Sequence, residues 1–391
     1  MKVYLDNAAT TPVEPRVLQA MLPYWEEKFG NPSSIHAWGQ EARKAIDKAR
    51  EQVAKALGAK PKEIIFTSCA TESINLAHKG LIESTKRHLI TSQVEHKAVL
   101  EACKHLEKLG IAQVTYLPVD KLGMVKIKDV EKAIRPETVL VSLMYVNNEV
   151  GTIEPIEEIG RLIKKINESR IGNQESKIYF HTDATQAIQY LNCDVNRLGV
   201  DLLSLTGHKI YAPKGIGALY LREGTPLVRQ QDGGGQEYKL RAGTENVPYI
   251  VALGKAIELV VQHRLSHAQR IAKLRDKLIK GVLQIPGVEL TGHPTQRVPH
   301  IASFVVKGAE GEAILLLLSD KGIAASSGSA CTSGLLKPSH VLTAMGIRPE
   351  VAHGSLRFSL SKHTTEKEID YVLKVLPGVI SQLRKMAPKG I

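Results

Sequence analysis

Seven short runs of β-branched and apolar residues recur between residues 63 and 221, and helical patterns separate most of them. This alternation is typical of a parallel sheet covered by helices. We therefore predict an α/β domain with a seven-stranded, mainly parallel sheet. The expected strands are Glu63–Thr67, His88–Thr91, Gln113–Leu117, Thr138–Met144, Lys177–His181, Asp201–Leu205 and Gly217–Leu221. The expected helices are Gln40–Ala56, Thr71–Glu83, Lys97–Leu109, Ile127–Ile134 and Ile156–Ile166.

The pattern changes after Gly243. A long amphipathic stretch is followed by apolar runs and two further helical patterns, which indicate a second, smaller α+β domain. We assign residues 15–258 to the large domain and residues 1–14 with 259–391 to the small one. The polar segment Asn167–Ser176 is expected to be an exposed loop. The segments after Gly243 are Val247–Leu283, Val288–Val306, Glu312–Leu318 and Glu366–Leu383.

The chain is long and apolar enough for two buried cores, with 391 residues of which 43% are hydrophobic. It carries 52 lysines and arginines against 40 aspartates and glutamates, a net charge of +12. Such a charge can attract nucleic acid, an anionic membrane or an acidic protein. Because the basic residues are spread through helical segments without a basic tail, no specific nucleic acid is expected.

The four cysteines, Cys69, Cys103, Cys193 and Cys331, are too widely spaced for a CxxC metal site or a dense disulfide framework. This usage favours a reducing cytoplasm, and no metal site is expected. The N-terminus lacks a basic flank followed by an apolar run, so no signal peptide is expected. The longest apolar runs are far below the ~20 residues that span a bilayer, so no membrane segment is expected.

Lys209 and Asp183 follow two neighbouring strands of the expected sheet. The carboxyl ends of parallel strands are where such sheets bind ligands. A lysine and a carboxylate at that edge are the pair that pyridoxal phosphate chemistry needs, one for the cofactor's aldehyde and one to keep its ring nitrogen protonated. The ordinary alternatives are a solvated lysine and a helix N-cap.

Two further strand ends carry polar groups. The strand Glu63–Thr67 runs into Ser68–Ser73 at the start of a helix, where free amides and the Thr71 hydroxyl suit a phosphate. An unliganded capping box would show the same pattern. His96 follows the next strand and brings an imidazole to the same edge, although a structural histidine is the usual alternative.

Taken in order, the motifs of nearly the whole chain resemble the cysteine desulfurases, members of the fold-type I, aminotransferase class V-like family of pyridoxal phosphate enzymes. No single motif is decisive, and it is their order and joint presence that is specific. The motifs are Tyr4–Thr11, Gly30–Ser34 with His36, Ala70–Ser73, Glu95–His96, Asn147–Gly151, Asp183 with Gln186, His208–Lys209, Gly233–Glu237, Arg241–Asn246, Ser326–Cys331 and Arg357–Ser359.

The resemblance implies a fold-type I transferase that binds pyridoxal 5'-phosphate and L-cysteine, with defined roles for the residues at the strand ends. Lys209 would form the Schiff base, Asp183 would pair with the pyridine nitrogen, Gln186 would contact the ring hydroxyl and His96 would stack on the ring. Ala70, Thr71, Thr206, Gly207 and His208 would surround the phosphate, Thr244 would reach it across a dimer interface, and Asn147 and Arg357 would hold the substrate carboxylate.

Cys331 is implied as the sulfur-accepting nucleophile, in the small domain. Its surroundings, Ala325–Gly334, are rich in Ser and Gly and are expected to form a mobile loop. Cys103 and Cys193 are expected to be small buried hydrophobes. Cys69 stands where the family more often has glycine or alanine, so its thiol is either silent or a second reactive sulfur near the cofactor.

The expected protein is a homodimeric, cytoplasmic cysteine desulfurase. It would convert L-cysteine to L-alanine, leave a persulfide on Cys331 and pass the sulfur to an acceptor protein, such as an iron–sulfur scaffold, or to a thiolation pathway. Three alternatives stay open at this point. A selenocysteine lyase would share scaffold and cofactor, an aminotransferase would have little use for Cys331, and a basic RNA-binding protein would lack a visible chromophore.

Overall fold

The large sheet has the strand order β2-β8-β7-β6-β5-β3-β4. The computed structural model describes the chain except for residues 83–86, 173–175, 329–337 and 387–391. Only β8 runs antiparallel to its neighbours in this sheet, so the seven expected strands and their mainly parallel arrangement are confirmed. The strands are β2 (Ile64–Thr67), β3 (Arg87–Ser92), β4 (Ala112–Leu117), β5 (Thr138–Ser142), β6 (Tyr179–Asp183), β7 (Leu202–Thr206) and β8 (Gly217–Leu221).

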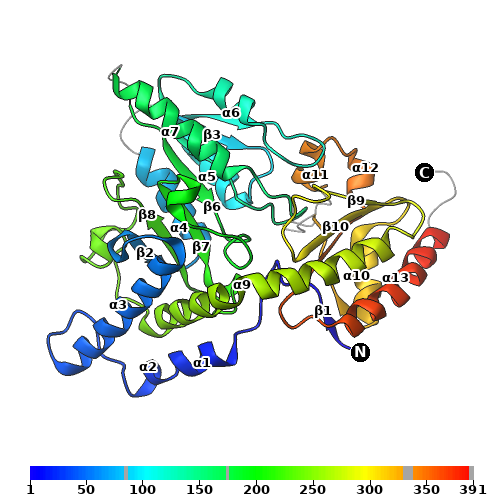
Figure 1. The fold of residues 1–391 in the computed structure, drawn as a ribbon, viewed down its shortest axis with the longest axis horizontal. Coiled ribbons are helices and arrows are strands. Elements are labelled where there is room, and N and C mark those ends of the chain that lie inside the picture. The colour runs from blue at the N-terminus through cyan, green and yellow to red at the C-terminus, as the bar shows by residue number, and fades with distance from the viewer. Residues whose placement is uncertain (83–86, 173–175, 329–337, 387–391) are drawn as a thin grey trace.

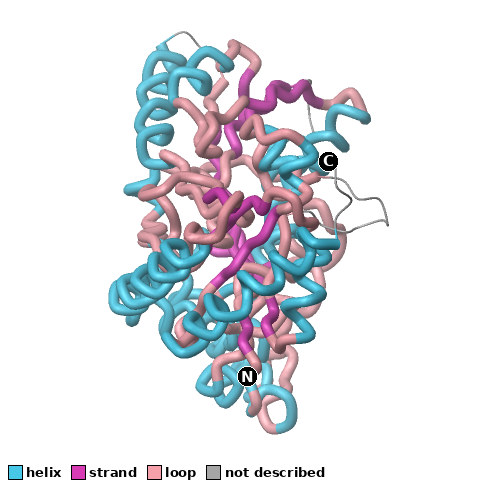
Figure 2. Tube along the Cα trace, turned by 90° about the vertical axis from the view of Figure 1, so that its right-hand side faces the viewer, coloured by secondary structure: helices cyan, strands magenta, loops and turns pink. Residues whose placement is uncertain are grey.

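Helices cover the large sheet on both sides, and Figure 2 shows the strands in the interior between them. Because β5 and β7 are buried along their whole length, their residues are mainly apolar and do not alternate between apolar and charged. The helices of this part are α1 (Pro15–Met21), α2 (Pro23–Glu26), α3 (Ala37–Leu57), α4 (Ala70–Ile82), α5 (Lys97–Lys108), α6 (Ile127–Ala133), α7 (Ile156–Gly172) and α8 (Val195–Leu198).

The expected loop at Asn167–Ser176 is wrong for its first part, because α7 continues to Gly172. Two polar side chains bind this end of the helix to the rest of the fold. The amide of Asn167 exchanges two hydrogen bonds with the backbone of Ile178, each 2.8 Å long. Arg170 donates to the carbonyls of Thr138 and Ser176. The polar residues Asn167 and Arg170 therefore make tertiary contacts and do not indicate an exposed loop.

The C-terminal part combines a three-stranded antiparallel sheet, in the order β12-β10-β9, with a parallel pair of β1 and β11. The long helix α9 (Val247–Val282) runs from the large sheet to this part, as Figure 1 shows. None of the helices in the described part of the chain has the length and apolar character needed to cross a bilayer. The elements are β1 (Val3–Tyr4), β9 (Val288–Leu290), β10 (Ile301–Val306), α10 (Gly311–Asp320), β11 (Ile323–Ala324), α11 (His340–Ala344), α12 (Pro349–Ala352), β12 (Ser355–Ser359) and α13 (Glu366–Met386).

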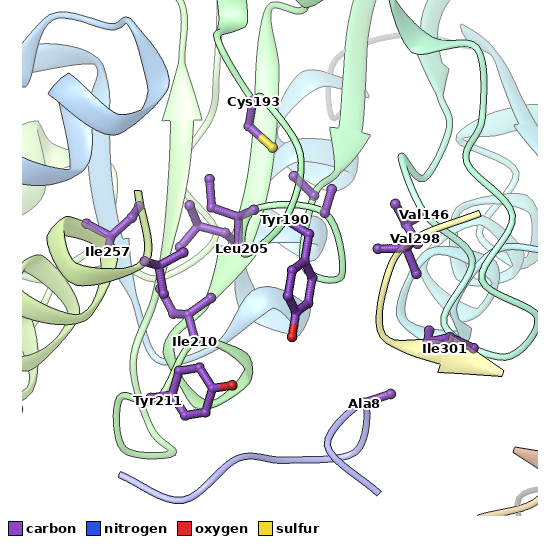
Figure 3. Packing of buried hydrophobic residues seen from close by; sticks show 14 of the residues in the cluster. Ala8, Val146, Tyr190, Cys193, Leu205, Ile210, Tyr211, Ile257, Val298 and Ile301 are labelled. Carbon is purple, nitrogen blue, oxygen red and sulfur yellow. The ribbon is translucent and has the colours of Figure 1, made fainter. Parts of the chain in front are cut away.

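One apolar cluster extends through both sheets. It includes Phe180 and Leu203 of the large sheet and Phe304 and Phe358 of the small one. Figure 3 shows part of this packing, where Tyr190 extends toward the N-terminal segment at Ala8 and Ile301 of β10 lies to its side. The small sheet is therefore packed firmly beside the carboxyl ends of the large sheet, where the expected site residues lie.

Arg50 of α3 and Glu237 of η3 (Glu237–Lys239) form a buried, two-pronged ion pair with nitrogen–oxygen distances of 2.7 and 2.8 Å. We expect Glu237→Ala to lower the free energy of unfolding by about 3–5 kcal/mol, because Arg50 would be left buried and unpaired. Equilibrium urea unfolding of the cofactor-free protein measures this loss. The control is Glu223→Ala, which removes an exposed carboxylate from Lys60 and Lys62. A Glu237 loss no larger than the Glu223 loss would contradict the assignment.

Candidate active site

A cavity of about 320 Å³ opens at the carboxyl ends of β6 and β7. Its volume falls in the range of roughly 300–1,000 Å³ that is typical of small-molecule sites. Nine of the expected site residues line it: Ala70, Thr71, His96, Asp183, Gln186, Thr206, His208, Lys209 and Arg357. Residues that were far apart in the sequence patterns therefore share one site.

Lys209 lies at the end of η2 (Gly207–Lys209), the single turn that follows β7. Its Nζ donates hydrogen bonds to the carbonyl oxygens of Ala8 and, at 2.9 Å, Ala9. Burial, followed by the positive charge of Arg357, lowers the pKa of Lys209 to about 8. A larger fraction of this amine is neutral and nucleophilic near pH 7 than of a solvated lysine.

Asp183 ends β6, and its side chain is buried beside Lys209 in the cavity wall. One of its carboxylate oxygens, Oδ1, accepts a hydrogen bond of 2.9 Å from the backbone of Thr185. One turn further on, the Gln186 amide donates to the carbonyl of Ala8 over 3.0 Å. The acid and the amide are thus both fixed at the edge of the cavity.

The cavity lining also includes hydrogen-bond donors. Helix α4 begins at Ala70, which lines the cavity, and the first amides of a helix have no intrahelical acceptor. Thr71, Thr206 and His208 line the same cavity, and the pKa of His208 is lowered to about 4 by burial and by the charge of Lys209. Donors of this kind suit an anion.

Gly207 does not line the cavity, although the sequence placed it among the cofactor contacts. A Cβ atom at this position would lie 2.7 Å from Ile216 and 3.0 Å from Ala212. The glycine allows the turn before Lys209 to pack closely against the following loop.

His96 is the N-cap of α5, and its Nδ1 accepts a hydrogen bond of 3.1 Å from the amide of Ala98. Desolvation lowers the pKa of His96 below its usual value; the charge of Asp183 opposes this change, and the charges of Lys209 and Lys97 add to it. The neutral ring therefore carries its proton on Nε2. A neutral imidazole in the cavity wall is suited to relay a proton.

Arg357 reaches the cavity from β12 of the small sheet. Its guanidinium donates to the carbonyl of Asn148 over 2.7 Å and to the carboxylate of Asp6 over 3.0 Å. Its Nε is buried without a partner among the described residues. An unsatisfied buried donor of this kind can bind a carboxylate ligand.

Asn147 is placed differently from Arg357. Its side chain is fully buried, donates to the carbonyl of Val94 and accepts from the amides of Glu149 and Val150, each over 2.9 Å. These bonds fix the turn that presents Asn148, which does line the cavity. A contact of Asn147 with the substrate carboxylate stays a prediction.

The remaining cysteines and Thr244 are distributed as follows. Cys331 lies outside the described residues, and Thr244 is exposed and does not line the cavity. Cys69 lines the cavity. Burial raises the pKa of Cys103 and of Cys193 to about 12, as expected for unreactive core thiols.

Several cavity residues carried no chemical signal in the sequence. The carbonyls of Ala8 and Ala9 hold Lys209, yet any residue supplies a carbonyl, so only the position of these alanines inside the motif Tyr4–Thr11 could have indicated them. The other residues that the sequence analysis missed are Ile74, Met144, Val146, Asn148 and Thr185.

The cavity fits pyridoxal 5'-phosphate in each of its parts. The partly buried Lys209 amine, with its lowered pKa, suits the aldehyde, and the Asp183 carboxylate suits the ring nitrogen. The start of α4 with Thr71, Thr206 and His208 supplies donors for the phosphate.

Residues 3–372 match the aminotransferase class-V family, and the chain belongs to this family of pyridoxal phosphate-dependent enzymes. Its relatives specify the type of enzyme, a cysteine desulfurase. The chain is 51% identical over 389 residues to "Cysteine desulfurase IscS" of Methanosarcina thermophila, with 99% of this chain and 94% of that one covered.

Solved structures agree with this assignment. A "NifS-like protein" superposes with a TM-score of 0.90 at 42% identity, with 98% of this chain and 100% of that one covered. A structure described as "SspA in complex with cysteine" superposes with a TM-score of 0.80 at 38% identity and covers 93% of this chain and 100% of its own.

We expect the cofactor-free protein to take up pyridoxal phosphate at a rate that rises with pH and levels off above about 8, because the neutral Lys209 amine is the nucleophile. Arg357→Met removes a positive charge that lowers the Lys209 pKa, so the rise should move to higher pH. The measurement is the return of visible absorbance from pH 6 to about 11, a range that includes the usual lysine pKa of 10.5.

The matched control is Arg348→Met, which removes an exposed arginine of the small part. It should leave the pH profile unchanged. If the wild-type rise were centred near the usual lysine pKa of 10.5, or if Arg357→Met did not move it, the electrostatic account of Lys209 would be rejected.

Proposed function

We propose that the protein converts L-cysteine to L-alanine and holds the released sulfur as a persulfide on Cys331. The observation that carries this proposal is the pairing of Arg357, in the cavity wall, with the chain that leads to Cys331. Ser326 and Arg357 exchange two backbone hydrogen bonds of 3.0 and 2.7 Å. Two residues on, the amide of Gly328 donates to the hydroxyl of Ser355 over 3.1 Å.

The position of Cys331 in the sequence supports the same proposal. It follows Gly328 by three residues and precedes Ser339 by eight. On the far side of the segment, Ser339 donates to the carboxylate of Glu149, and a Cβ on Gly328 would lie 2.5 Å from the same carboxylate. Both flanks of Cys331 thus meet at Glu149, beside the cavity.

Arg357, Lys209 and His96 of the cavity, together with Cys331, each have a separate role in the proposed reaction. Pyridoxal phosphate, when bound, supplies an electron sink for the carbon skeleton of the substrate. Arg357 binds the substrate carboxylate, and Nζ of Lys209 takes the α-proton. The Cys331 thiolate forms a new S–S bond to the substrate sulfur while the carbon–sulfur bond breaks and its electron pair stays on carbon. Protonation through Nε2 of His96 then completes L-alanine.

The sulfur on Cys331 requires a recipient, and we propose an acceptor protein such as an iron–sulfur scaffold. A persulfide needs a reduced thiol, and the described cysteines Cys69, Cys103 and Cys193 are all free. This chemistry supports the cytoplasm as the compartment. The relatives named cysteine desulfurase support cysteine as substrate, as does the neighbour described in complex with cysteine.

We propose that the protein acts as a homodimer in which Thr244 of one subunit reaches the phosphate site of the other. Large apolar side chains are exposed in the segment of residues 18–38, with Ile35 94% and Phe29 69% exposed. Exposed apolar patches of this kind mark interfaces. The others in this segment are Leu18, Leu22, Trp25 and Trp38.

Thr244 is exposed beside the same segment. Its neighbour Glu245 forms an ion pair of 2.6 Å with Arg43 of α3, the helix that carries Trp38 near its start. A surface that combines exposed aromatic rings and Thr244 fits a second copy that shares a cofactor site.

We also propose the division into residues 15–258 and residues 1–14 with 259–391. All strands of the large sheet fall in the first range and those of the smaller sheets in the second. The boundary lies within α9, which connects the two parts without a break. The large part would bind the cofactor, and the small part would carry Cys331.

Cys331→Ala should bind the cofactor and L-cysteine normally and lose sulfur transfer, because substrate binding and nucleophilic attack lie on different residues. Peptide mass spectrometry after cysteine treatment should place the added sulfur on Cys331 in the wild type. Cys69→Ala is the matched control and should keep alanine release. Added sulfur on Cys69, with Cys331 unmodified, would require a different nucleophile.

Trp38→Glu should convert the dimer into monomers and lower cofactor content on dilution, while Thr244→Ala should keep the dimer and weaken cofactor retention. Light scattering alongside visible absorbance over a dilution series measures both. Leu316→Glu alters an exposed leucine of α10 and serves as the control. A wild-type monomer that stays fully loaded at every concentration would defeat the shared-site proposal.

A further inference from the structure

His300 connects the small sheet to the cofactor site without lining the cavity. It stands immediately before β10, is 3% exposed, and its Nε2 lies 3.1 Å from Oε1 of Gln186. Gln186 lines the cavity on the large sheet. His300, beside the small sheet, thus contacts Gln186, which follows β6 of the large sheet, from outside the cavity.

The hydrogen-bond network fixes which atom donates. The Nε2 of Gln186 donates to the carbonyl of Ala8 over 3.0 Å, so its Oε1 must be the acceptor from His300. His300 therefore carries its proton on Nε2. Its Nδ1 is buried with no partner among the described residues, which suits an unprotonated nitrogen.

His300 is neutral near pH 7. Burial lowers the pKa of His300 to about 3, and the charges of Arg357, Lys209 and Arg275 act in the same direction. The ring is also held in place. It stacks on Tyr190 with 4.7 Å between ring centroids and 26° between planes, and its carbonyl accepts from the amide of Leu360 over 2.8 Å.

We propose that His300 is a positioning residue that orients the amide of Gln186, so that its NH₂ group and not its carbonyl faces the bound cofactor. This inference rests on the proposed function, in which Gln186 contacts the ring hydroxyl. Within the described residues, Ala8 is the one acceptor that Nε2 of Gln186 meets, so its second hydrogen is available to a ligand. Without the hydrogen bond from His300, the Gln186 amide can rotate by half a turn. Its Oε1 would then face the oxygen of the cofactor's ring hydroxyl.

The structure also explains why a neutral, singly protonated ring is needed. A protonated imidazole would add a buried positive charge beside Arg357 and Lys209. A carboxylate in its place could not donate to Oε1 at all. A neutral N–H group at the position of His300 Nε2 holds the Gln186 amide in one orientation and adds no charge to the site.

The test uses the cofactor-loaded enzyme and the pH titration of its visible absorbance. His300→Phe keeps a ring against Tyr190 and removes the donor, so the titration midpoint should rise by about one pH unit, a tenfold change in the proton equilibrium. His300→Gln places an N–H at the length of Nε2 and should restore the wild-type midpoint. His300→Asn is too short to reach and should behave like His300→Phe, which keeps the test available if one variant does not fold.

A double-mutant cycle with Gln186→Ala separates positioning from a general structural effect. In the Gln186→Ala background, His300→Phe should produce no further shift of the midpoint. An equal shift in both backgrounds would overturn the proposal, and so would an unshifted midpoint in His300→Phe or in Gln186→Ala at full cofactor content.

Alanine release by the wild-type enzyme is measured in parallel. A wild type that binds cofactor, shows the His300–Gln186 coupling and releases no alanine from cysteine would refute the proposed function while supporting the positioning role. Alanine release together with additive shifts in the cycle would refute the positioning role alone.

Discussion

The site depends on the contacts that the N-terminal segment makes at the carboxyl ends of the strands of the large sheet. The carbonyl of Ala8 accepts from both Lys209 and Gln186, and Asp6 accepts from Arg357. Asn7 donates to the carbonyl of Ser359 over 2.8 Å, which ties the same segment to β12. Residues Asp6 to Ala8 therefore contact both Lys209, which follows β7 of the large sheet, and Arg357 of β12 in the small sheet.

The same burial that holds these groups sets their charge. Desolvation lowers the pKa of Lys209 and of the histidines 96, 208 and 300, so these bases are neutral near pH 7 to a greater degree than in water. The guanidinium of Arg357 is a cation, and in a site of low dielectric a cation binds an anion strongly. The cavity wall thus combines the imidazoles of His96 and His208, which are mainly neutral near pH 7, with the positive charge of Arg357.

The sequence patterns were sufficient for the strands and for most helices, because each element has its own periodicity. The end of α7 was predicted wrongly, since Asn167 and Arg170 stabilise it through distant carbonyls that have no local signature. Lys209 and Asp183 could be recognised because they end adjacent strands. The contact between Lys209 and Ala8 spans 201 residues and uses backbone atoms, and His300 acts through Gln186, so no local pattern could reveal either.

The most direct test of this account is to locate the lysine that binds the cofactor. Borohydride reduction of the loaded enzyme, followed by digestion and peptide mass spectrometry, fixes the cofactor to the amine that holds it. The account predicts a single pyridoxyl-modified peptide with the modification on Lys209, because this amine lines the cavity together with Asp183 and has a lowered pKa. Modification of a different lysine, such as the nearby Lys214, with Lys209 unmodified, would contradict the account.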